Sequence, residues 1–245
     1  MNALQPARLL ITADGVPRSA THGDVYHSAD GGPEQAAHVF LGGNDLPGRW
    51  QGRERFVVLE IGFGLGLNFL TTWRAWRSDT QARGRLHYIA VEKHPPAEAD
   101  LAAIHARWPV LGALPAALRA QWPPPVGGVH QLQFDGGALA LTLLLGDARE
   151  CLPRIDAVAD AIYLDGFAPD RNPEPWSPDV CAQLARLTRP GSTLATWSVA
   201  GAVRRRLAAA GFIVEKRRGF GHKREMLRGW RASPPLNGPP VDAGA

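Results

Sequence analysis

Three alternating glycines follow an apolar run and could bind a ligand. Residues 56–59, Phe-Val-Val-Leu, are typical of a buried parallel strand, and Gly62, Gly64 and Gly66 come directly before a helical pattern that opens at Asn68. Strand, glycine turn and helix predict a βαβ unit that holds a ligand at the helix N-terminus. Glycines allow the sharp turn and the close approach, although such turns also serve packing alone. Glu60, just before this turn, would repel a pyrophosphate and could hold an ammonium group.

Acidic residues follow three further predicted strands. Because ligands lie outside the carboxyl ends of the strands in a doubly wound sheet, these acids are candidate site residues. Glu92 could accept both hydroxyls of a ribose, or pair with Lys93 at the surface. Asp147 could accept an adenine amino group, and could also cap the helix that follows. Asp165 could orient an amine and accept its proton, or merely cap a turn.

The order of the residues around the glycines is informative. A dinucleotide fingerprint requires G-x-G-x-x-G/A, whereas Leu67 occupies the place of its small residue. The pattern E-x-G-x-G-x-G resembles motif I of class I S-adenosylmethionine (SAM) methyltransferases. The resemblance implies that SAM is the cofactor. With the acids at the strand ends, the candidate cofactor-binding residues are Glu60, Gly62, Gly64, Gly66, Asn68, Glu92 and Asp147. Asp165 is the candidate catalytic residue.

Composition sets limits on the class of protein. The 245 residues are 45% hydrophobic, with a net charge of +4, which suits one globular α/β domain with an extension. Cys151 and Cys181 lie far apart, so we expect neither a disulfide framework nor a metal site. The sequence has no signal-peptide pattern and no apolar run of membrane-spanning length, and we expect a soluble cytoplasmic protein.

The charge is concentrated near the C-terminus. Residues 204–231 contain ten Lys or Arg and two acids, so this segment is about +8 and the remainder is about −4. Basic clusters with an interleaved aromatic residue are typical of RNA-backbone binding, while a solvated basic face is the simpler interpretation. The candidate RNA contacts are Arg204, Arg205, Lys216, Arg217, Phe220, Lys223 and Arg224.

Strands and helices alternate over most of the chain. Expected strands are 56–59, 86–92, 139–145, 161–165 and 192–198, with hairpins at 129–145 and 212–230 and a helix over 179–188 that ends at Pro190-Gly191. Asp14-Gly15 predicts a type I′ hairpin turn. We therefore predict a doubly wound α/β sheet with a terminal antiparallel hairpin. Its parts would be an N-terminal cap (1–55), the main domain (56–231) and a disordered tail (232–245).

Several stretches together resemble the methyltransferase domain of the MnmC-type enzymes that modify the tRNA wobble uridine. They are residues 24–50 and 184–212 together with FVVLEIGFGLGLNFLTTW, YIAVEKHP, YLDGFAPDRNPEPWS and KRRGFGHKREML. The loop within YLDGFAPDRNPEPWS and the hairpin KRRGFGHKREML are the specific parts, whereas the glycine loop alone is generic. The resemblance implies SAM-dependent methylation of the aminomethyl group of 5-aminomethyl-2-thiouridine. It also implies tRNA as partner. Phe167, Asn172 and Trp176, in the LDGFAP-x-x-NP-x-x-W loop, could line the substrate pocket.

The chain lacks a second glycine fingerprint, so we expect a stand-alone methyltransferase without FAD, which depends on other enzymes for the aminomethyl precursor. Two other functions stay open. An aminopropyltransferase acting on a small amine would share the sheet and the acids, but it does not explain the basic C-terminal segment. A non-catalytic RNA-binding module would leave the acids at successive strand ends without a purpose.

Overall fold

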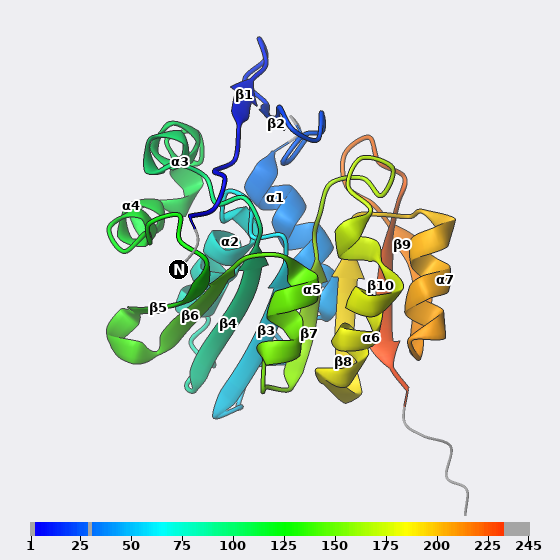
Figure 1. Ribbon diagram of the computed structural model, residues 1–245. Coiled ribbons are helices and arrows are strands. Elements are labelled where there is room, and N and C mark those ends of the chain that lie inside the picture. The colour runs from blue at the N-terminus through cyan, green and yellow to red at the C-terminus, as the bar shows by residue number, and fades with distance from the viewer. Residues whose placement is uncertain (1–2, 29–30, 233–245) are drawn as a thin grey trace, which may run out of the picture.

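An eight-stranded sheet forms the centre of the computed structural model, which describes residues 3–28 and 31–232. Its strand order is β5-β6-β4-β3-β7-β8-β10-β9 (Figure 1). The strands are β3 (Arg55–Ile61), β4 (Arg85–Glu92), β5 (Gly128–Phe134), β6 (Leu139–Leu145), β7 (Ala159–Leu164), β8 (Thr188–Thr196), β9 (Phe212–Arg218) and β10 (Glu225–Arg231). Strands β6, β4, β3, β7 and β8 are parallel, and β5 and β10 are antiparallel to their neighbours. The predicted doubly wound sheet with a terminal antiparallel hairpin is present.

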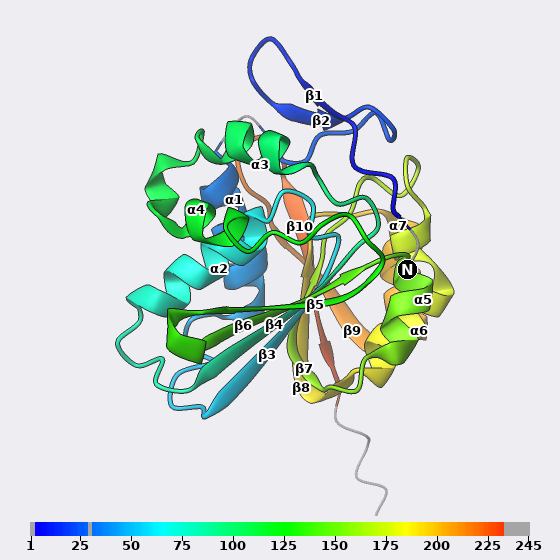
Figure 2. The ribbon, with the colours of Figure 1, turned by 60° about the vertical axis from the view of Figure 1, so that its left-hand side comes forward.

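The sheet is covered on both faces because its central strands are apolar throughout. Phe56 and Val58 of β3 pack into one layer, whereas Val57 and Leu59 pack into the other. Figure 2 shows the two helical layers on either side of the sheet. One layer holds α2 (Leu67–Ser78), α3 (Glu98–His105) and α4 (Leu114–Arg119); the other holds α5 (Ala148–Cys151), α6 (Pro178–Arg186) and α7 (Gly201–Ala209).

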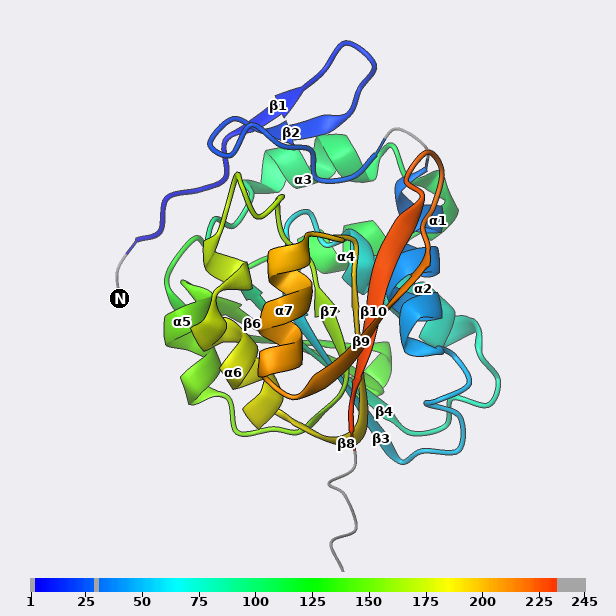
Figure 3. The same cartoon turned by 90° about the vertical axis from the view of Figure 1, so that its right-hand side faces the viewer.

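The residues before β3 join the same core. A small hairpin, β1 (Leu9–Ile11) and β2 (Pro17–Ser19), lies beyond the carboxyl ends of the main strands (Figure 3). After it come α1 (Gly32–Ala36), a π-helical turn (Ala37–Leu41) and a 3-10 turn (Gly42–Asn44). Val39 and Phe40 are buried in the core that also contains Phe56. The division at residue 55 stays a prediction, and the predicted tail lies outside the described residues from 233 onward.

Short 3-10 turns complete the described elements. They are Pro109–Leu111, Asp135–Gly137, Leu152–Arg154 and Glu174–Trp176. The Asp135–Gly137 turn joins β5 to β6, which confirms the expected hairpin.

Two local predictions were wrong. The β1–β2 turn has a positive φ only at Gly15 and not at Asp14, so it is not type I′, which requires two such residues. Pro190 and Gly191 do not simply end a helix, since they lie within β8. The β7–β8 register shifts between Ala159 and Ala161, and this irregularity accommodates a proline without an N–H and a glycine at φ +85°.

Gly62 lets the ends of two neighbouring strands meet. Its φ is +89°, and a Cβ added there would collide with the carbonyl oxygen of Asp165. The Gly62 N–H donates to the Val91 carbonyl at 3.0 Å, and the Asp165 N–H donates to Ile61 at 3.0 Å. The glycine loop, β4 and the β7 loop are therefore fixed relative to one another.

We expect Gly62→Ala to lower the free energy of unfolding by about 3 kcal/mol, because it adds a backbone collision to an unfavourable φ. Gly52→Ala is the matched control, since Gly52 has φ +71° and no atom within 4 Å of the added Cβ. This control should lose only about 1 kcal/mol. Urea denaturation measures both, and equal losses would contradict the packing argument.

Candidate active site

A cavity of about 540 Å³ opens at the carboxyl ends of the central strands. Its walls are the glycine loop, the ends of β4, β6, β7 and β8, the tip of the β9–β10 hairpin, and residues 21–28, which we call the strap. Nine of the predicted site residues line it together: Gly62, Gly64, Asn68, Glu92, Asp147, Asp165, Phe167, Asn172 and Lys223. The sheet edge therefore gathers residues that are up to 161 positions apart in the chain.

Glu92 fastens the glycine loop to the end of β4. Its two carboxylate oxygens accept hydrogen bonds from the backbone N–H groups of Gly64 and His94, each at 2.7 Å. Burial raises the pKa of this carboxyl, and the two backbone donors oppose the rise. A partly buried acceptor at this place suits a ligand that brings hydroxyl donors.

Asn68 bridges two carboxylates beneath the cavity. Its side-chain Nδ2 donates to Glu60 Oε1 at 2.8 Å and to Asp165 Oδ2 at 2.7 Å. Tyr88 donates to the second oxygen of Glu60 at 2.9 Å. Burial first, and then the Asp165 charge, raise the pKa of Glu60 well above its usual range. Glu60 and Asp165 thus share one amide as their common donor.

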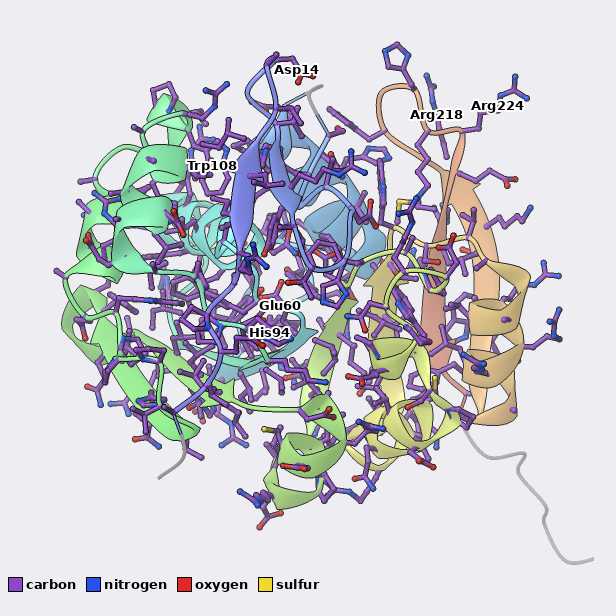
Figure 4. The ribbon with its side chains drawn as sticks, turned by 45° about the horizontal axis from the view of Figure 1, so that its top comes forward. Asp14, Glu60, His94, Trp108, Arg218 and Arg224 are labelled. Atoms are coloured by element: carbon purple, nitrogen blue, oxygen red, sulfur yellow. The ribbon has the colours of Figure 1, made fainter. Side chains whose placement is uncertain are left out.

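The position of Glu60 differs from the sequence-based hypothesis. We expected it beside a ligand ammonium, but it is fully buried and does not line the cavity. Figure 4 shows its side chain in the interior, below the level of the strap. The cause is the alternation of side chains along β3, which directs Glu60 into the layer beneath Asn68. Gly66 likewise lies behind the cavity wall, with a φ of +77° that starts α2.

Asp165 presents a partly buried carboxylate to the cavity at the end of β7. Burial raises its pKa to about 7, although the hydrogen bond from Asn68 and the charge of Lys223 oppose this rise. A carboxyl with this pKa exchanges a proton readily near neutral pH. Asp165 is therefore suited to orient an amine and to accept its proton.

Asp147 is strongly paired. Its side chain caps α5 by accepting from the Arg149 N–H at 2.9 Å, as the sequence predicted. It also pairs with the Arg149 guanidinium and with the Lys93 ammonium, each at 3.0 Å. These bonds, led by those from Arg149, hold the pKa of Asp147 well below its usual range. A ligand amino group that binds here must share the Asp147 carboxylate with Arg149 and Lys93.

The loop after β7 is held from two sides. Asp24 of the strap accepts from the Ala168 N–H at 2.8 Å. Trp176 donates its indole N–H to the Phe167 carbonyl at 2.9 Å. Trp176 is only 1% exposed and packs in the core, so the prediction that it lines the pocket was wrong. It supports the loop from below, while Phe167 and Asn172 face the cavity.

The strap was missed by sequence reasoning. Tyr26 packs its ring edge-on against Phe167, with 5.0 Å between centroids, and lies next to Gly64. His22 contacts the other side of Phe167, at 4.9 Å between centroids. The family-matching stretch 24–50 contains Asp24 and Tyr26, but no local pattern shows that these residues reach the cavity, because their partners lie far away in the chain. Trp197, just after β8, was missed for the same reason.

The basic residues near the C-terminus have three different environments. Lys216 pairs with Glu225 and Arg217 with Glu215, each at 2.8 Å. Arg204, Arg205 and Arg224 are exposed, and Phe220 packs against His38 at 5.7 Å between ring centroids. Arg218 and Arg224 extend into solvent from the hairpin tip (Figure 4). Lys223 instead lines the cavity.

Two kinds of feature are absent from the part of the chain that the structure describes. Over residues 3–28 and 31–232, none of the helices combines the length and the apolar character needed to cross a membrane. The same residues include no group of three or more His, Cys, Asp or Glu side chains arranged to hold a metal ion.

Comparisons with known proteins identify relatives. Residues 110–232 match a family model described as S-adenosyl-L-methionine-dependent methyltransferase. The bifunctional protein MnmC for tRNA 5-methylaminomethyl-2-thiouridine biosynthesis from Aromatoleum aromaticum is 58% identical over 226 residues, which are 92% of this chain and 36% of the relative. The protein of the same name from Cupriavidus necator is 54% identical over 242 residues, which are 96% of this chain and 37% of that relative. The chain thus spans about a third of the length of these relatives.

A solved structure supports the fold. MnmC2 from Aquifex aeolicus superposes with a TM-score of 0.73 at 24% identity, over 94% of this chain and 72% of that one. The expected class I methyltransferase fold is confirmed by this likeness and by the family match.

The raised pKa of Asp165 predicts how the stability of the ligand-free protein depends on pH. Its folded pKa is about 7 against an ordinary 3.8, so the folded chain retains a proton that the unfolded chain releases over this range. Asp165 therefore lowers stability progressively from about pH 4 to about pH 7, and no further above it. We expect Asp165→Asn to match the wild type near pH 4 and to be more stable by on the order of 3 kcal/mol at pH 8.

Chemical denaturation at pH 4, 6 and 8 measures this difference. Asp79→Asn is the control, because hydrogen bonds from the Gln81 N–H and the Trp50 indole lower the pKa of Asp79. That variant should lose stability at pH 8 instead of gaining it. A pH-independent difference between Asp165→Asn and the wild type would contradict the assignment.

Proposed function

Because the chain belongs to the S-adenosyl-L-methionine-dependent methyltransferase family, we propose that it methylates the aminomethyl group of 5-aminomethyl-2-thiouridine at the wobble position of tRNA. The product is 5-methylaminomethyl-2-thiouridine, the compound in the names of the relatives. The observation that carries this proposal is Asp165, a partly buried carboxylate that faces the cavity beside the glycine loop.

The residues present suit the cofactor. Gly62 and Gly64 line the cavity with backbone, and Glu92 supplies a partly buried acceptor for ribose hydroxyls. Asn68 lines the floor between them, and Asp147 borders the place for the adenine. When bound, SAM supplies an electrophilic methyl group. The acidic character of the site suits SAM, since no phosphate has to be accommodated near Glu92 and Asp165.

The protein's own residues then act on the acceptor. An alkyl amine is mostly protonated near neutral pH, and only its neutral form has a lone pair to donate. The amine forms a nitrogen–carbon bond to the methyl group as the sulfur–carbon bond breaks, and the secondary ammonium that results carries one proton too many. Asp165 orients the amine beforehand and accepts this proton. Holding both reactants in near-attack geometry provides much of the acceleration.

The tRNA is recognised by the outer surface of the hairpin. Arg218 and Arg224 extend from its tip (Figure 4), and the same tip carries Lys223, which lines the cavity. Arg204 and Arg205 lie on α7, whose start follows the cavity-lining residue Ala200. Exposed cations neutralise phosphates and release counterions, which makes binding sensitive to salt. Lys216 and Arg217 are already paired with Glu225 and Glu215, so we expect them to contribute less to tRNA binding.

The proposal is tested by transfer of label from methyl-labelled SAM. The acceptors are tRNA bearing 5-aminomethyl-2-thiouridine, the same tRNA without the aminomethyl group, and small polyamines. We expect label only on the first acceptor. We also expect Asp165→Ala to lose turnover by at least about 100-fold while its affinity for SAM changes less than about threefold.

Asn172→Ala is a control for the acceptor side, since it alters the pocket wall without touching the Asp165 carboxylate. It should raise KM more than it lowers kcat. Label on polyamines would indicate a different amine acceptor, and normal turnover by Asp165→Ala would remove the catalytic role from this residue.

A further inference from the structure

Lys223 points inward from a turn whose neighbours point outward. The turn is closed by bonds from the Gly219 N–H to Arg224 (2.9 Å) and from the Lys223 N–H to Phe220 (3.1 Å). A Cβ on Gly219 would collide with the Lys223 carbonyl, so the turn requires glycine there. Lys223 lines the cavity, whereas Arg224 extends into solvent (Figure 4). The turn therefore directs Lys223 into the cavity and keeps it apart from Arg224 on the outer surface.

The Lys223 ammonium lies at the acceptor end of the cavity without a close counter-ion. It sits 4.6 Å from the centre of the Trp197 ring, which stabilises a cation through its negative face. The charges of Asp24 and Asp165 act on it, while burial lowers its pKa. Within residues 3–28 and 31–232, no carboxylate pairs directly with this ammonium. Lys223 and Asp165 line the same cavity, and each charge acts on the other without a direct ion pair in the described residues.

We propose that Lys223 is a positioning residue that keeps the acceptor amine unprotonated and Asp165 ionised in the loaded site. This inference rests on the proposed function. A fixed positive charge in the same cavity as Asp165 disfavours an ammonium there and favours the neutral amine that can attack. The same charge stabilises the carboxylate that must receive the proton.

The charged groups around Lys223 come from several elements. Asp24 belongs to the strap and Asp165 to the loop after β7, and the charges of both act on Lys223. Glu92, at the end of β4, acts on Asp165. The strap also contributes Tyr26 and His27, whose raised and lowered pKa values respectively keep them neutral near pH 7. Acids therefore outweigh cations at this end, and Lys223 offsets part of their field.

Other cations near the cavity are engaged or differently placed. Lys93 is bound by Asp147 and Glu174 at the opposite, cofactor end. On the hairpin itself, Arg218 and Arg224 are exposed. This arrangement leaves Lys223 as the residue whose removal should change proton affinities at Asp165.

The experiment compares pH profiles of kcat for the wild type, Lys223→Met and Lys223→Arg, with SAM and tRNA saturating. We expect Lys223→Met to move the acidic limb upward by roughly one pH unit, with kcat recovering to within about threefold of wild type at high pH. Lys223→Arg should keep the wild-type limb. Arg224→Met is the matched control, and it should raise the KM for tRNA without moving the limb. A uniform loss of kcat at every pH would overturn the inference.

A second measurement needs no catalysis. The carboxyl pKa of Asp165 is followed by NMR in aspartate-labelled protein with SAM bound, and Asp165→Asn assigns the signal. We expect a higher pKa in Lys223→Met, and in Lys223→Gln should the first variant fold poorly. An unchanged pKa overturns the inference whether or not the wild type transfers methyl groups. A raised pKa in a protein that does not methylate the modified tRNA would refute the proposed function and the amine role together, while retaining the Lys223–Asp165 coupling.

Discussion

One side-chain amide, that of Asn68, connects two carboxylates beneath the cavity. Asn68 donates to Glu60 and to Asp165, two carboxylates from neighbouring strands that would otherwise repel each other in a buried environment. The bridge fixes the Asp165 side chain at the end of β7 and partly offsets the penalty of burying its charge. A proton acceptor poised near neutral pH therefore depends on a residue that need not touch the acceptor substrate.

The surrounding loops protect this bridge and shape the cavity above it. Gly62 lets the backbone of Asp165 approach β3, Glu92 ties the glycine loop to β4, and Asp24 ties the strap to the loop that carries Phe167. The hairpin tip closes the acceptor end with Lys223 inside and arginines outside. One short turn thus joins the surface proposed for tRNA to the chemistry proposed for the amine.

Periodicity and topology make part of the site predictable from the sequence. Glu92, Asp147 and Asp165 were found because parallel strands end at one edge of the sheet, so residues after them must converge. Glu60 and Trp176 were misplaced because a motif gives a position in the chain and not the direction of a side chain. The strap and the inward turn of Lys223 arise from contacts between distant segments, such as Asp24 with Ala168, which no local pattern encodes.

The role of the bridge is tested most directly by the single-turnover rate of methyl transfer in Asn68→Leu, which keeps the branched shape of the side chain but removes the shared donor. With SAM and modified tRNA both saturating at pH 7, we expect the rate to fall by on the order of 100-fold, since Asp165 becomes protonated and loses its orientation. A rate within about threefold of the wild type, in a variant that binds SAM, would contradict this role of the bridge.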